Sequence, residues 1–215
     1  MNRGIIHKTE EFVRNTLGDD TTGHDWHHIE RVRRNALYIA KKEQKGDSFL
    51  IEMAALLHDI PDAKLNTSGE AGERKLSDFL EQLEISEEAS SSIKAIIDSV
   101  SFKGGHNIRV LSAEAQIVQD ADRLDAIGAV GIARAFAYGG KKGQLIYDPS
   151  LVIRKEMSEE EYRNGRSSSI NHFYEKLLKL RDLLNTDAAM EMAEERHEFI
   201  EQFLHQFFKE WNGQA

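Results

Sequence analysis

A histidine and an aspartate end the most apolar segment of the chain. Residues 49–57 read Phe-Leu-Ile-Glu-Met-Ala-Ala-Leu-Leu, a pattern that is apolar on nearly every face and predicts a buried helix. His58 and Asp59 follow directly, and Pro61 should push Ile60 out of the helical conformation and end the helix there. A buried carboxylate is costly unless it is paired or binds a cation. The pair therefore indicates either a polar turn that ends the helix or a site of chemistry.

Two further segments carry side chains of the same kind. Residues 23–32 read Gly-His-Asp-Trp-His-His-Ile-Glu-Arg-Val, and residues 119–126 read Gln-Asp-Ala-Asp-Arg-Leu-Asp-Ala. The series His28, His58-Asp59 and Asp122 matches the H…HD…D signature of the HD-domain metal-dependent phosphohydrolases. The flanking patterns HxxRV, LLHD and DADRLDA also match. The chain thus resembles a small stand-alone bacterial member of that superfamily, nearly from end to end.

Length and patterning predict the fold class. The chain has 215 residues, 40% of them hydrophobic and 30% charged, which suits one globular domain with a single core. It shows no persuasive strand pattern, internal repeat or linker. We therefore expect an all-α fold of about eight to ten helices, forming a single domain over residues 1–215. The resemblance implies that this domain is a helical HD-domain bundle.

Apolar periodicity and capping residues place the other helices. Asp25 is expected to cap the helix that carries His28. A helix rich in small residues is expected from Leu124 to Tyr138, with Asp122 at its start. The remaining predicted helices span residues 5–17, 68–83, 86–100, 110–118, 170–184 and 188–211. The apolar faces of the last two read as core or as a homodimer face.

Composition excludes several classes of protein. The chain has no cysteine, so it has neither disulfides nor a thiolate metal site. No apolar run approaches the roughly 18 residues of a membrane span, and residues 1–7 do not resemble a signal peptide, so the cytoplasm is the default compartment. The formal net charge of −9 argues against a broad surface for a nucleic-acid polymer. A phosphorylated substrate would need a metal ion and local basic side chains to attract it.

The resemblance implies a metal site. Its ligands would be His28, His58, Asp59 and Asp122, holding one divalent ion, because the sequence shows no second set of histidines for a dinuclear site. A mixed nitrogen and oxygen set suits Mn, Fe, Co, Ni or Zn, and ligand type alone does not choose among them. The resemblance and the phosphate chemistry favour Mn or Mg. His24 lies four residues before His28, but in an expected loop, and should support the site or line its mouth.

Two acidic residues are candidates for catalysis. In the related guanosine-tetraphosphate hydrolases, an acid three residues after the HD pair is thought to help activate the attacking water. The resemblance gives this role to Asp62, although those relatives usually have Glu. Asp125 follows Asp122 by three residues on the same helical face, where it could contact substrate or orient a ligand.

Basic residues near the motifs are candidates for binding phosphate. Arg31 shares a helical face with His28, and Lys64 and Arg123 adjoin the other two motifs. For each of these three, ordinary ion pairing is the alternative. Lys103 lies on a glycine loop, where it could contact substrate or face solvent.

Together these features predict a divalent-metal phosphohydrolase whose small phosphorylated substrate is a nucleotide. Among the small bacterial relatives, the activity of a nucleoside triphosphate pyrophosphohydrolase is favoured over that of a 5′-nucleotidase, a phosphomonoesterase. A cyclic-dinucleotide phosphodiesterase is a third option, but the longer proline-containing motif of that branch is absent. A helical regulatory module without catalysis is a different class, and the intact set of four site residues argues against it.

Overall fold

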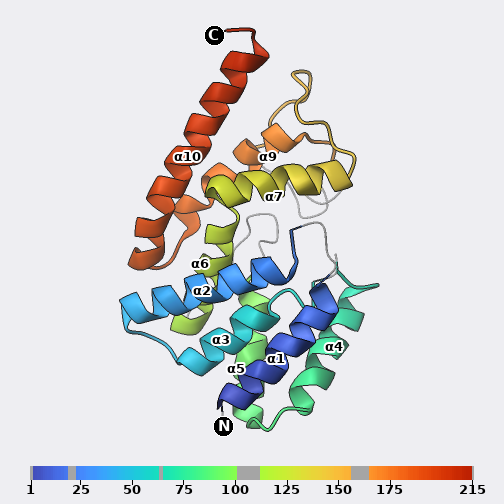
Figure 1. Ribbon diagram of the computed structural model, residues 1–215, viewed down its shortest axis with the longest axis vertical. Coiled ribbons are helices and arrows are strands. Elements are labelled where there is room, and N and C mark those ends of the chain that lie inside the picture. Colours follow the sequence, from blue (N-terminus) through green and yellow to red (C-terminus); the bar gives the residue numbers. More distant parts are fainter. Residues whose placement is uncertain (1, 19–22, 63–64, 101–111, 156–164, 215) are drawn as a thin grey trace. The chain divides into compact units, whose positions relative to one another are not determined.

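The computed structural model describes residues 2–18, 23–62, 65–100, 112–155 and 165–214 (Figure 1). Over these ranges the chain forms nine α-helices, short 3₁₀ turns and no strand, which confirms the predicted all-α class. The chain divides into two compact units, Met1–Asp122 and Arg123–Ala215, and each is described by itself. That residues 1–215 form one domain stays a prediction. Within the described ranges, no helix combines the length and apolar character that a membrane crossing requires.

The first unit is built around its most apolar helix. Its helices are α1 (Asn2–Leu17), α2 (Trp26–Glu43), α3 (Ser48–Leu57), α4 (Gly69–Glu81), α5 (Glu87–Val100) and α6 (Ala113–Asp125) as far as Asp122. Helix α3 contacts α1, α2 and α5 (Figure 1). Its residues from Met53 to Leu57 have no solvent exposure, which confirms the predicted buried helix.

Helix α3 ends before the position at which Pro61 was expected to end it. Its last residue is Leu57, and the chain then turns tightly, with the Ile60 amide donating to the Leu57 carbonyl at 3.0 Å. The Asp62 amide repeats the pattern by donating to the Asp59 carbonyl at 3.1 Å. Bonds of this i to i+3 type are common where a helix tightens before it stops. The turn, rather than the helix itself, carries the HD pair.

Side-chain caps fix where the helices of this unit begin. The Asp25 carboxylate accepts from the His28 amide at 2.8 Å, so the predicted cap of α2 is confirmed. Asp47 and Ser68 cap α3 and α4 in the same way, by accepting from amides of their first turns. Each cap satisfies amides that have no partner within the helix.

The predicted continuous helix over residues 124–138 is wrong. Helix α6 runs on to Asp125, so Asp122 lies in its last turn and not at the start of a helix. A new helix, α7 (Gly128–Lys141), follows after a break at Gly128, whose φ of +74° lies in the left-handed region. A Cβ atom at this position would also come within 3.0 Å of the Arg196 side chain. Glycine alone satisfies both constraints easily, which explains the break.

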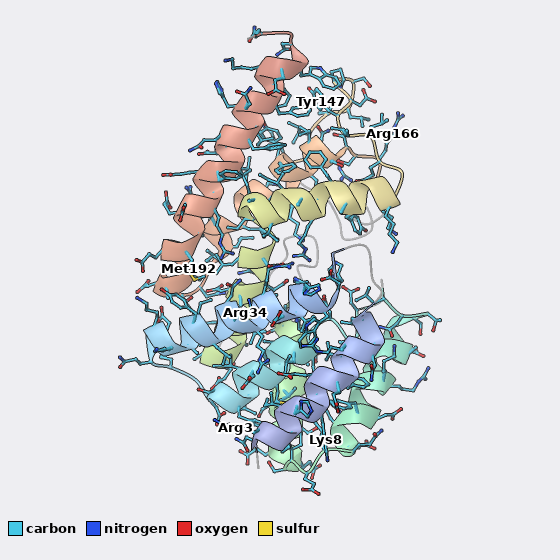
Figure 2. All side chains as sticks on the ribbon, viewed as in Figure 1. Arg3, Lys8, Arg34, Tyr147, Arg166 and Met192 are labelled. Carbon is cyan, nitrogen blue, oxygen red and sulfur yellow. The ribbon has the colours of Figure 1, made fainter. Side chains whose placement is uncertain are left out.

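The second unit packs α7 against α9 (Ser169–Glu175) and α10 (Asp187–Trp211). The 3₁₀ turns η2 (Leu177–Lys179) and η3 (Arg181–Leu183) lie between the last two helices. Near the end of α10, Tyr147 packs edge-on against Phe208 and Trp211, with ring centroids 5.3 and 5.0 Å apart (Figure 2). The predicted helix over residues 188–211 is therefore present and well anchored.

The predicted helix over residues 170–184 is wrong beyond Glu175. The backbone leaves the helical region at Lys176, and the chain continues as 3₁₀ turns. Just before this break, Arg154 donates from Nε and Nη2 to the buried Glu175 carboxylate at 2.9 and 2.7 Å. Asn171 also donates to the Leu151 carbonyl at 3.1 Å. These tertiary contacts tie α9 to the preceding segment, and such contacts readily override helix propensity.

Candidate metal centre

The structure brings the four residues of the H…HD…D series together within the first unit. His28 extends from the first turn of α2, where the Asp25 cap fixes the backbone. His58 and Asp59 lie in the turn after α3, and Asp122 lies in the last turn of α6. Three separate segments of the chain therefore supply one cluster.

The side chains of the cluster are spaced like ligands around a common ion. His28 Nε2 lies 3.4 Å from Asp59 Oδ2 and 3.6 Å from Asp122 Oδ1. His58 Nε2 lies 3.5 Å from Asp59 Oδ1 and 3.8 Å from Asp122 Oδ1. These separations exceed the usual length of a hydrogen bond. They approach the ~3.0–3.6 Å between neighbouring ligand atoms that follows from metal bonds of about 2.0–2.2 Å.

The buried ring nitrogen of His58 supplies the test of whether a metal fits. Its other nitrogen, Nδ1, lies 2.9 Å from the Ala55 carbonyl oxygen, which can only accept, so Nδ1 carries the proton. Nε2 then presents a lone pair, is buried, and has no hydrogen-bond partner among the described residues. A ring fixed through one nitrogen by a backbone carbonyl is the usual arrangement of a metal-binding histidine. The donor set therefore fits a divalent ion.

Asp59 provides buried negative charge at the centre of the cluster. Burial raises the pKa of its carboxyl group, but the neighbouring His58 and His24, with a hydrogen bond from His24, hold the pKa well below its usual value. The group is therefore ionised at neutral pH. The shortest of these contacts joins His24 Nδ1 to Asp59 Oδ2 at 2.8 Å.

Two asparagines brace the segments that carry the ligands. Asn35, which lies on α2 beyond His28, donates to the Ala121 carbonyl at 3.4 Å, next to Asp122. Asn66 donates to the carbonyls of Ile60 and Asp62 at 2.8 and 2.9 Å. Sequence reasoning did not find Asn66, because no local pattern marks an amide that bonds backward to a turn.

Asp62 follows the HD pair in the same turn, and its side chain is partly exposed. Its backbone is held on both sides, by the Asp59 carbonyl and by the Asn66 amide. The carboxylate therefore extends from a well-fixed turn next to the cluster. Its role in catalysis stays a prediction.

The other predicted residues lie in different surroundings. In the second unit, the buried Asp125 carboxylate accepts from Arg134 at 2.8 Å, and Arg123 donates to the Leu183 carbonyl. Arg31 is partly buried on α2. Lys64 and Lys103 lie outside the described residues. The substrate contacts predicted for Arg31, Arg123, Lys64 and Lys103, and the role of Asp125, stay predictions.

Comparisons with known proteins identify a family whose model covers the cluster. The HD domain family model matches residues 25–127, a range that includes all four clustered residues. The chain is 50% identical to an HD-superfamily hydrolase of known structure from Bacillus thuringiensis, covering 100% of both chains with a TM-score of 0.76. A Lactobacillus plantarum protein of known structure is 40% identical over 97% of each chain, with a TM-score of 0.89.

A third relative has been solved with a ligand. Bacillus subtilis YpgQ in complex with ADP is 38% identical, with 95% of this chain and 97% of that chain covered and a TM-score of 0.76. The chain belongs to the HD-domain superfamily. The relatives support a hydrolase role, and the His and Asp cluster could hold a metal ion.

Proposed function

We propose that this protein is a divalent-metal-dependent nucleotide hydrolase and that its activity is that of a nucleoside triphosphate pyrophosphohydrolase. His28, His58, Asp59 and Asp122 would hold one ion, with Mn or Mg favoured. One observation carries the proposal: two buried imidazole nitrogens face two carboxylates at 3.4–3.8 Å, and His58 Nε2 has no other described partner.

The chain's own residues would divide the remaining work. A divalent ion in this site supplies Lewis-acid polarisation of a phosphoryl oxygen. Asp62 orients the attacking water and accepts its proton as the general base. Arg31, together with Lys64, Lys103 and Arg123, would contact the phosphates. Such local positive charge is needed because the whole chain carries a formal net charge of −9, which repels a polyanionic substrate.

The bond changes of the proposed reaction balance without a further reactant. The water oxygen forms a bond to the α-phosphorus, and the bond between that phosphorus and the α–β bridging oxygen breaks. Pyrophosphate leaves with the bridging oxygen, and the proton lost by water passes to the Asp62 carboxylate. The products are a nucleoside monophosphate and pyrophosphate.

The ADP bound to YpgQ supports the choice of a nucleotide. ADP carries an α–β anhydride, the same kind of bond that the proposed reaction cleaves. It also has the base, sugar and phosphates that a nucleotide site must accommodate.

A hydrolysis panel tests the proposal. Purified full-length protein with Mn²⁺ or Mg²⁺ is given nucleoside triphosphates, diphosphates and monophosphates, and the release of pyrophosphate and of phosphate is measured separately. We expect pyrophosphate and monophosphate from triphosphates, and loss of both with a chelator. Phosphate released from monophosphates alone would instead show a 5′-nucleotidase. No hydrolysis of any nucleotide by metal-loaded protein would overturn the proposal.

A further inference from the structure

A fifth side chain makes closer contact with the cluster than its members make with one another. His24 Nδ1 lies 2.8 Å from Asp59 Oδ2, whereas the four contacts between the imidazoles and carboxylates of the H…HD…D series span 3.4–3.8 Å. The shorter distance is that of a charge-assisted hydrogen bond. Because the ionised carboxylate can only accept, His24 donates through Nδ1.

The backbone around His24 is fixed by the start of α2. The next residue, Asp25, caps the helix through its side chain, and its carbonyl accepts from the Ile29 amide at 3.2 Å. His24 therefore enters the cluster from an anchored position, and its ring meets the His28 ring edge to face with centroids 5.5 Å apart. The same cap thus positions both histidines relative to Asp59.

Asp59 needs such a partner to hold one orientation. Rotation of an aspartate carboxylate about χ2 is soft, so packing of the chain alone does not fix its two oxygens. In the structure, Oδ1 faces His58 and Oδ2 faces His28. A donor on Oδ2 holds the carboxylate in this orientation. Nδ1 of His24 is committed to this bond and cannot also bind an ion.

We propose that His24 is a positioning residue that orients Asp59 through the Nδ1–Oδ2 hydrogen bond and thereby raises the affinity of the site for a divalent ion. This inference rests on the proposed metal centre. Partners that orient a ligand in this way typically contribute about 10- to 100-fold to metal affinity.

Substitution of His24 by asparagine, alanine or glutamine distinguishes this role from that of a direct metal ligand or of a packed ring. The amide nitrogen of asparagine takes the place of Nδ1, whereas that of glutamine takes the place of Nε2. We therefore expect His24→Asn to bind Mn²⁺ almost as tightly as the unmodified protein. His24→Ala and His24→Gln should bind it about 10- to 100-fold more weakly. His27→Ala is the matched control, because His27 is an exposed neighbour on α2, and it should leave the affinity unchanged.

Calorimetric titration of full-length protein with Mn²⁺ measures these affinities without nucleotide, and melting of each metal-free variant verifies that it is folded. Unchanged affinity in His24→Ala would overturn the inference. So would equal weakening in all three variants, because an asparagine could not restore the role of a direct ligand or of a packed ring. The proposed metal centre fails separately, if the unmodified protein binds no Mn²⁺.

Discussion

Asp59 is a buried carboxylate whose negative charge is surrounded by imidazole side chains. The neighbours Leu56, Leu57 and Ile60 are fully or almost fully buried, so they offer the carboxylate no solvation. Three imidazoles surround the charge instead, with His24 Nδ1 at 2.8 Å and the Nε2 atoms of His28 and His58 at 3.4 and 3.5 Å. A buried charge of this kind requires such partners or a cation.

The sequence motif predicts part of this arrangement. The spacing of His28, His58, Asp59 and Asp122 identified four residues that the structure brings together. It could not show that His24 bonds to Asp59, because the loop before α2 has no periodicity from which to infer direction. Nor could it show that the neighbours of Asp125 and Arg123 are Arg134 and the Leu183 carbonyl. The first contact crosses the break between α6 and α7, and the second joins segments that are 60 residues apart in the sequence.

At the residue scale, substitution of Asp62 tests catalysis separately from the binding of metal and substrate. Substitution by asparagine keeps the size of the side chain but removes the basic oxygen. We expect Asp62→Asn to keep its Mn²⁺ content and its substrate affinity, while turnover falls by about 10²- to 10⁴-fold, the usual contribution of a positioned general base. Metal analysis and steady-state kinetics provide the measurement.

Asp59→Asn is the matched comparison for this variant, because it changes a proposed ligand and should weaken Mn²⁺ binding itself. If Asp62 only stabilises the turn after Pro61, its substitution will lower stability by about 1 kcal/mol and spare turnover. Near-normal turnover in Asp62→Asn would remove this residue from the mechanism.

At the scale of elements, α4 supports the turn that carries the HD pair. Gly72 of α4 lies so close to this turn that an added Cβ atom would come within 2.6 Å of the Pro61 carbonyl oxygen and 2.8 Å of Asn66 Nδ2. Lys75 of α4 also donates to Asn66 Oδ1 at 2.7 Å. The position of α4 is therefore coupled to the backbone between Ile60 and Asp62.

A methyl group at Gly72 should disturb both stability and the site. We expect Gly72→Ala to lower the free energy of unfolding by about 1–3 kcal/mol, the usual effect of overpacking, and to weaken Mn²⁺ binding. Urea unfolding and calorimetry measure the two effects. Gly69→Ala in the same helix is the control, because an added Cβ there meets nothing within 4 Å. Equal stability of the two variants would contradict the coupling.

The ion pair between Arg154 and Glu175 makes a prediction about acid stability. Burial raises the pKa of Glu175, but hydrogen bonds from Arg154 and Ser167 and the charge of Arg154 lower it below 4.5 overall. The pKa of Glu175 is lower in the folded state than in the unfolded state. The ionised carboxylate therefore stabilises the fold fully at pH values above the unfolded-state pKa. This stabilisation is lost as the pH falls through the folded-state pKa.

Removing the charge of Glu175 should therefore make the free energy of unfolding less sensitive to acid. Between pH 6 and pH 3, we expect the free energy of unfolding to fall more steeply in the unmodified protein than in Glu175→Gln. Urea unfolding at several pH values provides the measurement. Parallel curves for the two proteins would show that Glu175 titrates alike in the folded and unfolded states.

Local patterns predicted helices better than they predicted where helices break. The buried helix α3, the cap of α2 and the long α10 followed from apolar runs and capping residues. The break between α6 and α7 depends on the left-handed backbone of Gly128 beside Arg196, a residue far along the chain. A glycine in a helix rich in small residues gives no sign of this contact.

At the scale of the whole molecule, the all-α class and the superfamily were predictable, because they rest on features spread over the chain. No strand forms among the described residues, as the lack of strand patterns in the sequence predicted. The four motif residues lie within the range 25–127 that the HD domain family model matches. The division at Asp122 and Arg123 was not predictable, since no linker marks it and α6 runs through it. Amino-acid composition is a property of the whole chain and does not indicate which of its residues contact one another.

The central claim is that His28, His58, Asp59 and Asp122 form a centre for one divalent ion. Its most direct test is the stoichiometry of Mn²⁺ binding, measured by calorimetry on the full-length protein, on His58→Ala and on His205→Ala as a control at an exposed histidine. We predict one ion per chain for the unmodified protein and the control, and loss of both binding and nucleotide hydrolysis in His58→Ala. Full occupancy in folded His58→Ala would contradict the assignment.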